Sequence, residues 1–434
     1  MASVHQLPAE LLIHIFSCLT QSFPSWKEYR VLDRHRFVLC VVCSRWRDIT
    51  ISTPALWASI YIGRVSDDQI NPFPSLDVFK LCLERSGNIA PLAICLHECP
   101  QPFLGQTWAI LYPHFHRIGD IMIVARSRDD LFKLLPIPYA PALKSLTCHE
   151  IIQESSQGRL IFKSDLVTDE RGLPSLRSLD VENIPFRSLF KIPVGQLTAL
   201  RLSVPTSLTT IAPLSIEWNE VFDILRQCVS LVDLHANLVG SARDGFPTEI
   251  IDLPKLERLT IYHPHLASHL QTPRLECIHA FNGGVVCDPQ QPLPCLRMYI
   301  AEVGYHGLRG WCVPKSFATL EQLHFIECGR SAVRNVLARL AESASSGDDR
   351  MPLFPRLQTL RLSRLAVFPR SDVGLTAVIF KLLDAMPSLR IECVRGELFL
   401  YGLTHGQHEK YAHRLLPPTS TSGGPYSHED HDMI

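Results

Sequence analysis

The sequence contains no uninterrupted apolar run that approaches the roughly 20 residues of a membrane-spanning helix. It also has no excess of charge of one sign, because 42 Lys and Arg residues stand against 43 Asp and Glu residues and leave a net charge of −1. We therefore expect neither nucleic acid nor a membrane as a partner. No basic segment precedes the first apolar stretch, which Glu10 and His14 interrupt, so we expect no secretory signal and an intracellular location, cytoplasmic or nuclear.

Motifs of common catalytic sites are missing as well. The sequence has no Gly-x-Ser-x-Gly turn, no Walker-type glycine loop and no dinucleotide fingerprint. Two histidine groups occur: His263, His265 and His269 near Asp252, and His405, His408 and His413. Pro264 excludes a helix across the first group, and neither spacing brings three ligands together by itself. Loop histidines are the simpler explanation, and we expect no enzyme, no cofactor and no metal site.

The fourteen cysteines are dispersed along a long chain, which is not the pattern of a disulfide-rich secreted domain. We expect reduced thiols. Cys40 and Cys43 have the CxxC spacing of a redox or zinc site, but they lie in an apolar stretch with no second pair nearby. Packed structural thiols are the favoured interpretation.

The most informative segment is at the N-terminus. Pro8 and Glu10 predict the first turn of a helix, where proline is tolerated and an acidic side chain meets the positive end of the helix dipole. A broad apolar stripe follows at Leu11, Leu12, Ile15, Phe16 and Leu19. A second helix is predicted to carry Val38, Val42 and Trp46 on one face, with Leu39 and Cys43 beside them and Arg45, Arg47 and Asp48 at its end.

Three motifs therefore occur in order: Leu-Pro-x-Glu-Leu-Leu from Leu7, Leu-x-x-Val-Cys-x-x-Trp-Arg from Leu39, and Pro-x-Leu-Trp from Pro54. This order resembles the F-box, the helical module by which substrate receptors dock onto the Skp adaptor of cullin–RING ubiquitin ligases. The resemblance implies adaptor contacts from Leu7, Pro8, Glu10, Leu11, Leu12, Ile15, Phe16, Leu19, Leu39, Val42, Cys43 and Trp46. The segment 21–34 is longer than in the compact form of the module. The alternative is a pair of ordinary core helices.

A second pattern begins near residue 141. The unit Leu-x-x-Leu, often preceded by proline, recurs with first leucines at Leu143, Leu176, Leu197, Leu231, Leu256, Leu275, Leu296, Leu320, Leu357 and Leu389. Several of the intervals lie in or near the 20–29 residues of leucine-rich repeats, and longer ones have room for helices at 218–225, 333–340 and 378–386. The pattern resembles an irregular leucine-rich repeat solenoid, in which only Cys328 stands out at the usual Asn or Cys position. Unrelated strand or helix starts are the alternative, since leucine is common.

The predicted fold class is therefore α/β: a helical F-box at 1–59, a connecting region of divergent first repeats at 60–140, a solenoid of short parallel strands at 141–416 and a disordered tail at 417–434. The connecting region is predicted to contain a helix at 79–88 with a glycine C-cap, a strand at 91–96, and a second helix and strand at 112–117 and 118–124. It looks like the region that follows the F-box in many fungal F-box proteins.

The resemblance implies a substrate receptor that joins an unknown protein target to the Skp adaptor and, through it, to cullin. Target contacts are expected from strand residues that point away from the inner leucines, namely Arg201, His235, Tyr262, His279, Phe281, His324 and Arg361, beside Asp180, Glu182, Asn237 and Thr260. Their mixed charge and aromatic content suit a protein target. Two alternatives stay open: ordinary exposed strand residues, and a non-catalytic scaffold without a role in ubiquitin transfer.

Overall fold

The computed structural model describes residues 6–20, 35–63, 75–99, 101–125, 137–150, 172–183, 192–203, 218–238, 247–263, 266–281, 293–302, 318–326, 328, 330–345, 354–363, 373–394, 410–411 and 414–416. These residues fall into two compact units, with the boundary between Leu197 and Thr198. The predicted segment boundaries after residues 59, 140 and 416 differ from this division and stay predictions.

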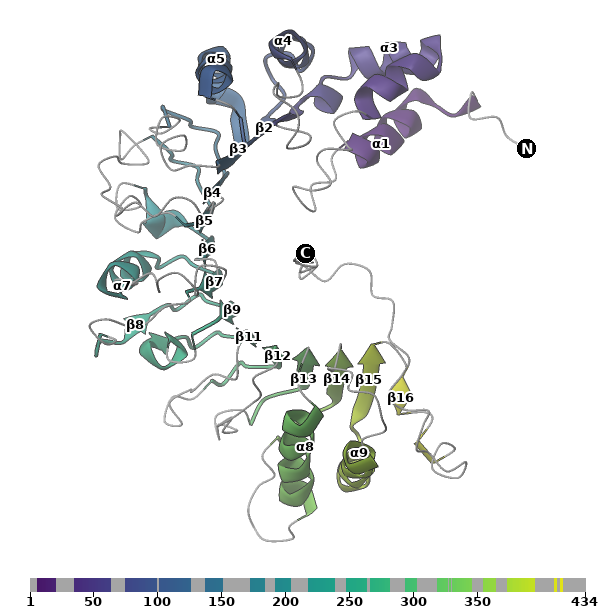
Figure 1. Cartoon of the computed structure of the whole chain (residues 1–434), viewed down its shortest axis with the longest axis vertical. Coiled ribbons are helices and arrows are strands. Elements are labelled where there is room, and N and C mark those ends of the chain that lie inside the picture. Colours follow the sequence, from purple (N-terminus) through teal and green to yellow (C-terminus); the bar gives the residue numbers. More distant parts are fainter. Residues whose placement is uncertain are drawn as a thin grey trace. The chain divides into compact units, whose positions relative to one another are not determined.

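Unit 1 begins with helices and continues as a parallel sheet (Figure 1). Its helices are α1 (Ala9–Thr20), α3 (Ser44–Ser52), α4 (Leu76–Arg85) and α5 (Gln101–Leu111), with further helical residues at 35–42 and 3₁₀ turns at Pro54–Trp57, Tyr112–Arg117 and Val194–Gln196. Its strands are β1 (Ser59–Gly63), β2 (Leu92–His97), β3 (Ile118–Ala125), β4 (Ser145–Glu150) and β5 (Ser178–Glu182). Each strand pairs in parallel with the next along the chain.

The sequence predicted most of these elements, with two corrections. The helix predicted to run through Trp46 is interrupted at Cys43, which is extended with φ −159° and whose Sγ accepts the N–H of Trp46 as the N-cap of α3. Val42 and Trp46 thus belong to different helices, and Arg45, Arg47 and Asp48 begin α3 instead of ending a helix. Helix α5 was not predicted. The glycine C-cap of α4 is confirmed, since Gly87 has φ +63°.

Unit 2 continues the same alternation of strands and connections. Its main sheet contains β6 (Ala199–Ser203), β7 (Asp233–Asn237), β9 (Arg258–Ile261), β11 (Cys277–Phe281), β12 (Met298–Glu302), β13 (Gln322–Ile326), β14 (Thr359–Ser363), β15 (Arg390–Val394) and β16 (Leu415–Leu416). A separate parallel pair joins β8 (Ile251–Asp252) to β10 (Leu270–Gln271), close to a 3₁₀ turn at Leu266–His269. The helices are α7 (Trp218–Gln227), α8 (Arg330–Ser345) and α9 (Val373–Ala385). All three lie where the sequence placed helices, and α8 and α9 lie side by side (Figure 1).

A tight turn precedes almost every repeated leucine. In nine of the ten units the leucine N–H donates to the carbonyl three residues earlier, at 3.0–3.2 Å, as in Leu256 to Leu253 and Leu296 to Leu293. In seven of these turns the second residue is proline, whose fixed φ suits that position of a turn. The ten first leucines are all at most 2% exposed. The Pro-x-Leu pattern is therefore explained by a turn that introduces each strand.

Each turn is also tied to the unit before it. The carbonyl of Lys144 accepts the N–H groups of both Arg177 and Ser178, and the carbonyl of Thr198 accepts those of Val232 and Asp233. The same shared acceptor recurs before β9, β11, β12, β13 and β14, whereas before β15 the Gln358 carbonyl accepts the N–H of Arg390. Backbone groups that would be left without partners in an isolated turn are thereby satisfied by the neighbouring unit.

The strand register stacks the inner side chains in rows. In unit 2 one row runs through Leu200, Leu234, Leu259, Ile278, Tyr299, Leu323, Leu360 and Ile391, each at most 2% exposed. In unit 1 the matching row contains Ile60, Ile94, Ile121, Leu146 and Leu179. Since side chains alternate along a strand, the intervening residues form the opposite face of each sheet.

The last strands of unit 2 are fixed by polar contacts to α9. The Arg414 guanidinium donates to the carbonyls of Leu383 and Leu389 at 2.9 Å and to that of Met386 at 2.5 Å, around the C-terminus of the helix. The Tyr411 hydroxyl donates to Asp384 at 2.6 Å. A cation at this end also complements the helix dipole.

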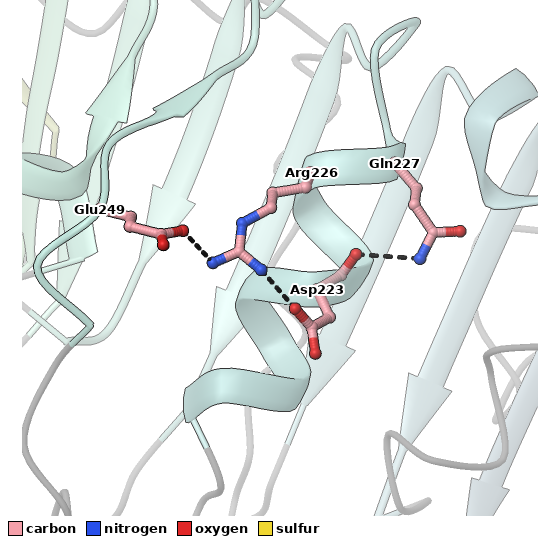
Figure 2. A network of polar contacts seen from close by, with 4 residues as sticks. All are labelled: Asp223, Arg226, Gln227 and Glu249. Atoms are coloured by element: carbon pink, nitrogen blue, oxygen red, sulfur yellow. Dashed lines mark hydrogen bonds and ion pairs between the residues drawn. The ribbon is translucent and has the colours of Figure 1, made fainter.

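Helix α7 is joined to the segment ahead of β8 by a surface ion-pair network (Figure 2). Arg226 contacts Asp223 within the helix and Glu249 outside it, while the Gln227 side-chain amide donates to the Asp223 carbonyl at 3.0 Å. All of these groups are exposed, so each ion pair contributes little to stability. The buried face of α7, including Val221, Phe222 and Leu225, holds the helix in place.

We predict that Leu234→Ala lowers the free energy of unfolding of unit 2 by about 2–5 kcal/mol, because it opens a cavity in the inner row between Leu200 and Leu259. Urea titration followed by circular dichroism measures the change. Val229→Ala, at a 53% exposed position, is the matched control and should stay within about 0.5 kcal/mol of the unaltered chain. Equal losses from both changes would contradict the inner-row assignment.

Candidate functional site

An apolar surface covers the N-terminal helices. Leu11, Ile15 and Leu19 lie at i, i+4 and i+8 along α1 and are 51%, 45% and 42% exposed. Residues 35–42 add Val38 and Val42, which are 53% and 52% exposed. We call these five residues the apolar helix surface. The described strands leave these five side chains 42–53% exposed, which distinguishes them from residues of an ordinary core face.

Other residues of the predicted adaptor site lie behind this surface. Leu12, Phe16 and Leu39 are at most 4% exposed, and the adaptor contacts assigned to these three stay predictions. They pack the helices together. The Phe16 ring lies 4.9 Å from that of Trp46, and the Arg45 guanidinium donates to the Leu7 carbonyl at 2.5 Å, which shows how α1 is held against α3.

The remaining members of the predicted adaptor site lie nearer the surface. Pro8 and Glu10 are exposed, whereas Leu7, Cys43 and Trp46 are partly exposed. The adaptor contacts assigned to them, and to Leu11, Ile15, Leu19 and Val42, stay predictions. The long segment 21–34 between the helices lies outside the described residues.

Trp57 joins the helical region to the first strand. It is fully buried, and its indole N–H donates to the Thr50 carbonyl at 2.7 Å. The Arg85 guanidinium of α4 lies 4.5 Å from the ring centroid, and Phe37 packs edge-on at 5.7 Å. The helices that carry the apolar helix surface are therefore packed, through Trp57, against the sheet of unit 1.

The predicted target-binding residues come together on the outer face of the unit 2 sheet. The register aligns Arg201, His235, Thr260, His279, Ile300, His324, Arg361 and Glu392 in one row. Tyr262 and Phe281 lie two residues farther along their strands. The sequence thus placed seven candidate residues on one face, although it did not give their neighbours across strands.

Several of these side chains are less exposed than predicted. His279 and Phe281 are 2% and 7% exposed, and Thr260 is 2% exposed, so these three side chains are buried in the described chain. Phe281 stacks on Tyr262 with centroids 3.9 Å apart and rings nearly parallel at 4°. Arg201 is exposed, and His235, Tyr262, His324 and Arg361 are partly exposed. A role of these residues in target binding stays a prediction.

Burial makes the middle of this face unfavourable for charge. It raises the pKa of Tyr262, and the nearby Glu302 raises it further. It lowers the pKa of His324 to about 3, with the positive charge of Arg361 and the proximity of His279 acting in the same direction. His324 is therefore neutral at physiological pH, with Nε2 2.7 Å from the Ser363 hydroxyl.

Sequence reasoning overlooked two positions. Glu302, which lies 3.1 Å from His279, became apparent only from the strand register. Cys99 follows β2 with the spacing that Cys328 has after β13, and each thiol donates to a carbonyl of the preceding strand region, Ile62 at 3.3 Å and Ala301 at 3.4 Å. The spacing of Cys99 after Ile94 and Leu96 was a usable signal for this position.

The histidine and cysteine groups show no further site in the described ranges. The described residues hold no group of three or more His, Cys, Asp or Glu side chains arranged for a metal ion, and His265, His405, His408 and His413 lie outside them. Cys40 and Cys43 are free thiols. Within the same part of the chain, no helix has the length and apolar character needed to cross a bilayer.

Residues 4–63 match the F-box-like family. The matched segment includes α1, α3, Trp57 and β1, and so contains the whole apolar helix surface. No curated protein matches the chain. The structure adds that the F-box-like region is followed by a mostly parallel sheet with helices, in agreement with the predicted α/β class.

We predict that acidification weakens unit 2 through His324. The pKa of His324 is about 6.5 in the unfolded chain and about 3 in the folded chain. Between these two pH values the imidazole is protonated in the unfolded chain and neutral in the folded chain. Stability from this group is thus present above pH 6.5 and is lost through this window, by at most about 1.4 kcal/mol per pH unit. Urea midpoints at pH 7.5 and 5.5 should differ less for His324→Gln than for the unaltered chain. The exposed His116→Gln is the control, and an equal pH response of all three proteins would refute the assignment.

Proposed function

We propose that this protein is the substrate receptor of a cullin–RING ubiquitin ligase, in which the F-box-like region binds the Skp adaptor. The single observation that supports this most directly is the coincidence of the matched segment with the apolar helix surface. Folded monomers rarely leave large contiguous apolar patches open to water, and such patches are typical of protein interfaces. A helix pair that exposes Leu11, Ile15 and Val42 is suited to a largely apolar partner groove.

The rest of the chain is proposed to be an irregular leucine-rich repeat solenoid that selects the target. The recurring turn, the shared carbonyl acceptors and the stacked inner row support this interpretation. Arrays of this kind present extended rows of side chains from successive strands, which suits recognition of a protein segment. In this proposal the chain has no catalytic role of its own, and ubiquitin transfer is carried out by the other subunits.

A second proposal is a non-catalytic binding protein that keeps its F-box-like helices without taking part in ubiquitin transfer. The outer face of unit 2 supports binding in either case. The two proposals differ only in whether the apolar helix surface contacts the adaptor.

We predict that Ile15→Asp abolishes co-purification with the Skp adaptor, because a carboxylate would be buried without a partner in an apolar interface. Ile15 is 45% exposed, so the variant should keep the fold and its circular dichroism spectrum. Ile89→Asp, at a 94% exposed position outside the F-box-like segment, is the control and should retain the adaptor. Phe16 is unsuitable for this test because it is fully buried.

If the unaltered chain and Ile89→Asp bring down no adaptor, the receptor proposal fails and the binding-protein proposal remains. Retention of the adaptor by Ile15→Asp would instead show that the contact lies elsewhere on the chain.

A further inference from the structure

The centre of the outer face of unit 2 has an unusual charge pattern. On β11, β12 and β13 the outward positions are occupied by Cys277, His279, Phe281, Met298, Ile300, Glu302, Gln322, His324 and Ile326. Glu302 is the single carboxylate among these nine residues, and no Lys or Arg accompanies it. His324 adds no positive charge, since its pKa is lowered to about 3.

In the described part of the chain, Glu302 has no ion pair with a Lys or Arg side chain. Among the described residues its partner is His279, whose Nε2 lies 3.1 Å from Oε2. An imidazole N–H can donate this hydrogen bond, but it does not offer the planar set of donors of a guanidinium. The Glu302 side chain is 21% exposed, so it remains accessible to a ligand.

Two other carboxylates on the outer face of unit 2 have arginine partners, unlike Glu302. Asp233 contacts the Arg258 guanidinium at 2.9 Å, and Glu392 lies 4.0 Å from that of Arg361. Arg201, the cation that acts on Tyr262, belongs to β6, two strands away from β9. Glu302 is therefore distinguished from Asp233 and Glu392 by having histidine, and not arginine, as its partner.

Aromatic surface lies directly beside this carboxylate. Phe281 is the register neighbour of Glu302 on β11 and stacks on Tyr262, which in turn lies 5.9 Å from the His235 ring. A carboxylate next to aromatic side chains is the chemistry that recognises a guanidinium, which pairs with carboxylate through a planar set of N–H donors and lies favourably against aromatic rings.

We propose that the outer face of β11–β13 binds an arginine side chain of the protein target, with its guanidinium on Glu302 and its aliphatic stem against Tyr262, which Phe281 supports from beneath. This inference rests on the proposed function and specifies the class of target: an accessible segment that carries arginine beside apolar residues. The charge of the site selects against an acidic residue at the same position, because two carboxylates would then be brought together in a partly buried environment.

The test uses the full-length chain and immobilised pools of random-sequence peptides with arginine, lysine, citrulline or glutamate fixed at the central position. We expect binding in the order arginine, lysine, citrulline, with glutamate weakest. Glu302→Gln should weaken binding of the arginine pool about tenfold, which corresponds to about 1.4 kcal/mol, and should remove its advantage over citrulline. Asp252→Asn, at an exposed position on β8, is the matched control and should leave the order unchanged.

The inference is overturned if the pools bind equally, or if Glu302→Gln keeps the arginine preference. A charge-reversed variant, Glu302→Arg, gives an independent check because it should transfer the preference to the glutamate pool. Adaptor binding is measured on the same protein samples. Loss of the peptide preference with the adaptor retained contradicts this inference alone, whereas loss of adaptor binding with the preference retained contradicts the receptor proposal alone.

Discussion

The shared backbone carbonyl that precedes seven of the described strands is the interaction on which the rest of the structure depends. A single turn and a five-residue strand cannot bury their leucines or satisfy their backbone groups alone. When the Thr198 carbonyl accepts the N–H groups of Val232 and Asp233, the next turn is fixed at the same height as the one before it. The inner side chains then meet in rows, and the outer side chains are aligned on the opposite face. Core packing and surface recognition thus follow from the same register.

This constraint also explains which parts of the fold the sequence could predict. The Pro-x-Leu-x-x-Leu pattern is local, because the turn, its proline and the first buried leucine lie within a few residues, and those strands were predicted correctly. The break at Cys43 was not predicted, since a cysteine sulfur is a weak acceptor and its use as an N-cap depends on how α1 and α3 pack. Helix α5 contains Pro102 and Gly105, which weaken the helical pattern, although tertiary contacts favour the helix.

The apolar helix surface and the outer face of unit 2 were also predictable only where the pattern is local in sequence. The apolar stripe of α1 follows from spacing within one helix, but the sequence could not show that Phe16 points inward while Ile15 points outward. On the strands, alternation indicated an outward direction for His279 and Phe281. Their burial comes from neighbours such as Tyr262 and Glu302, which are about 20 residues distant in sequence and meet them only through the register. On the strands, therefore, the direction of a side chain was predictable and its surroundings were not.

The apolar helix surface and the outer face of unit 2 differ in chemistry. This difference matches the partners proposed for them, the Skp adaptor for the first and a protein target for the second. The side chains of Leu11, Ile15 and Val42 provide exposed apolar surface area and form no directional bonds. Many different proteins with a similar apolar helix face could therefore bind the same adaptor. The outer strand face instead contains polar groups that are paired one by one, as in Asp233 with Arg258, and a partner there must replace or extend specific contacts. In the proposed receptor, discrimination between targets would therefore depend on the few outer groups that lack an oppositely charged partner among the described residues. Substitutions at the outer positions can alter these polar groups without disturbing the inner row, because inner and outer positions alternate along every strand.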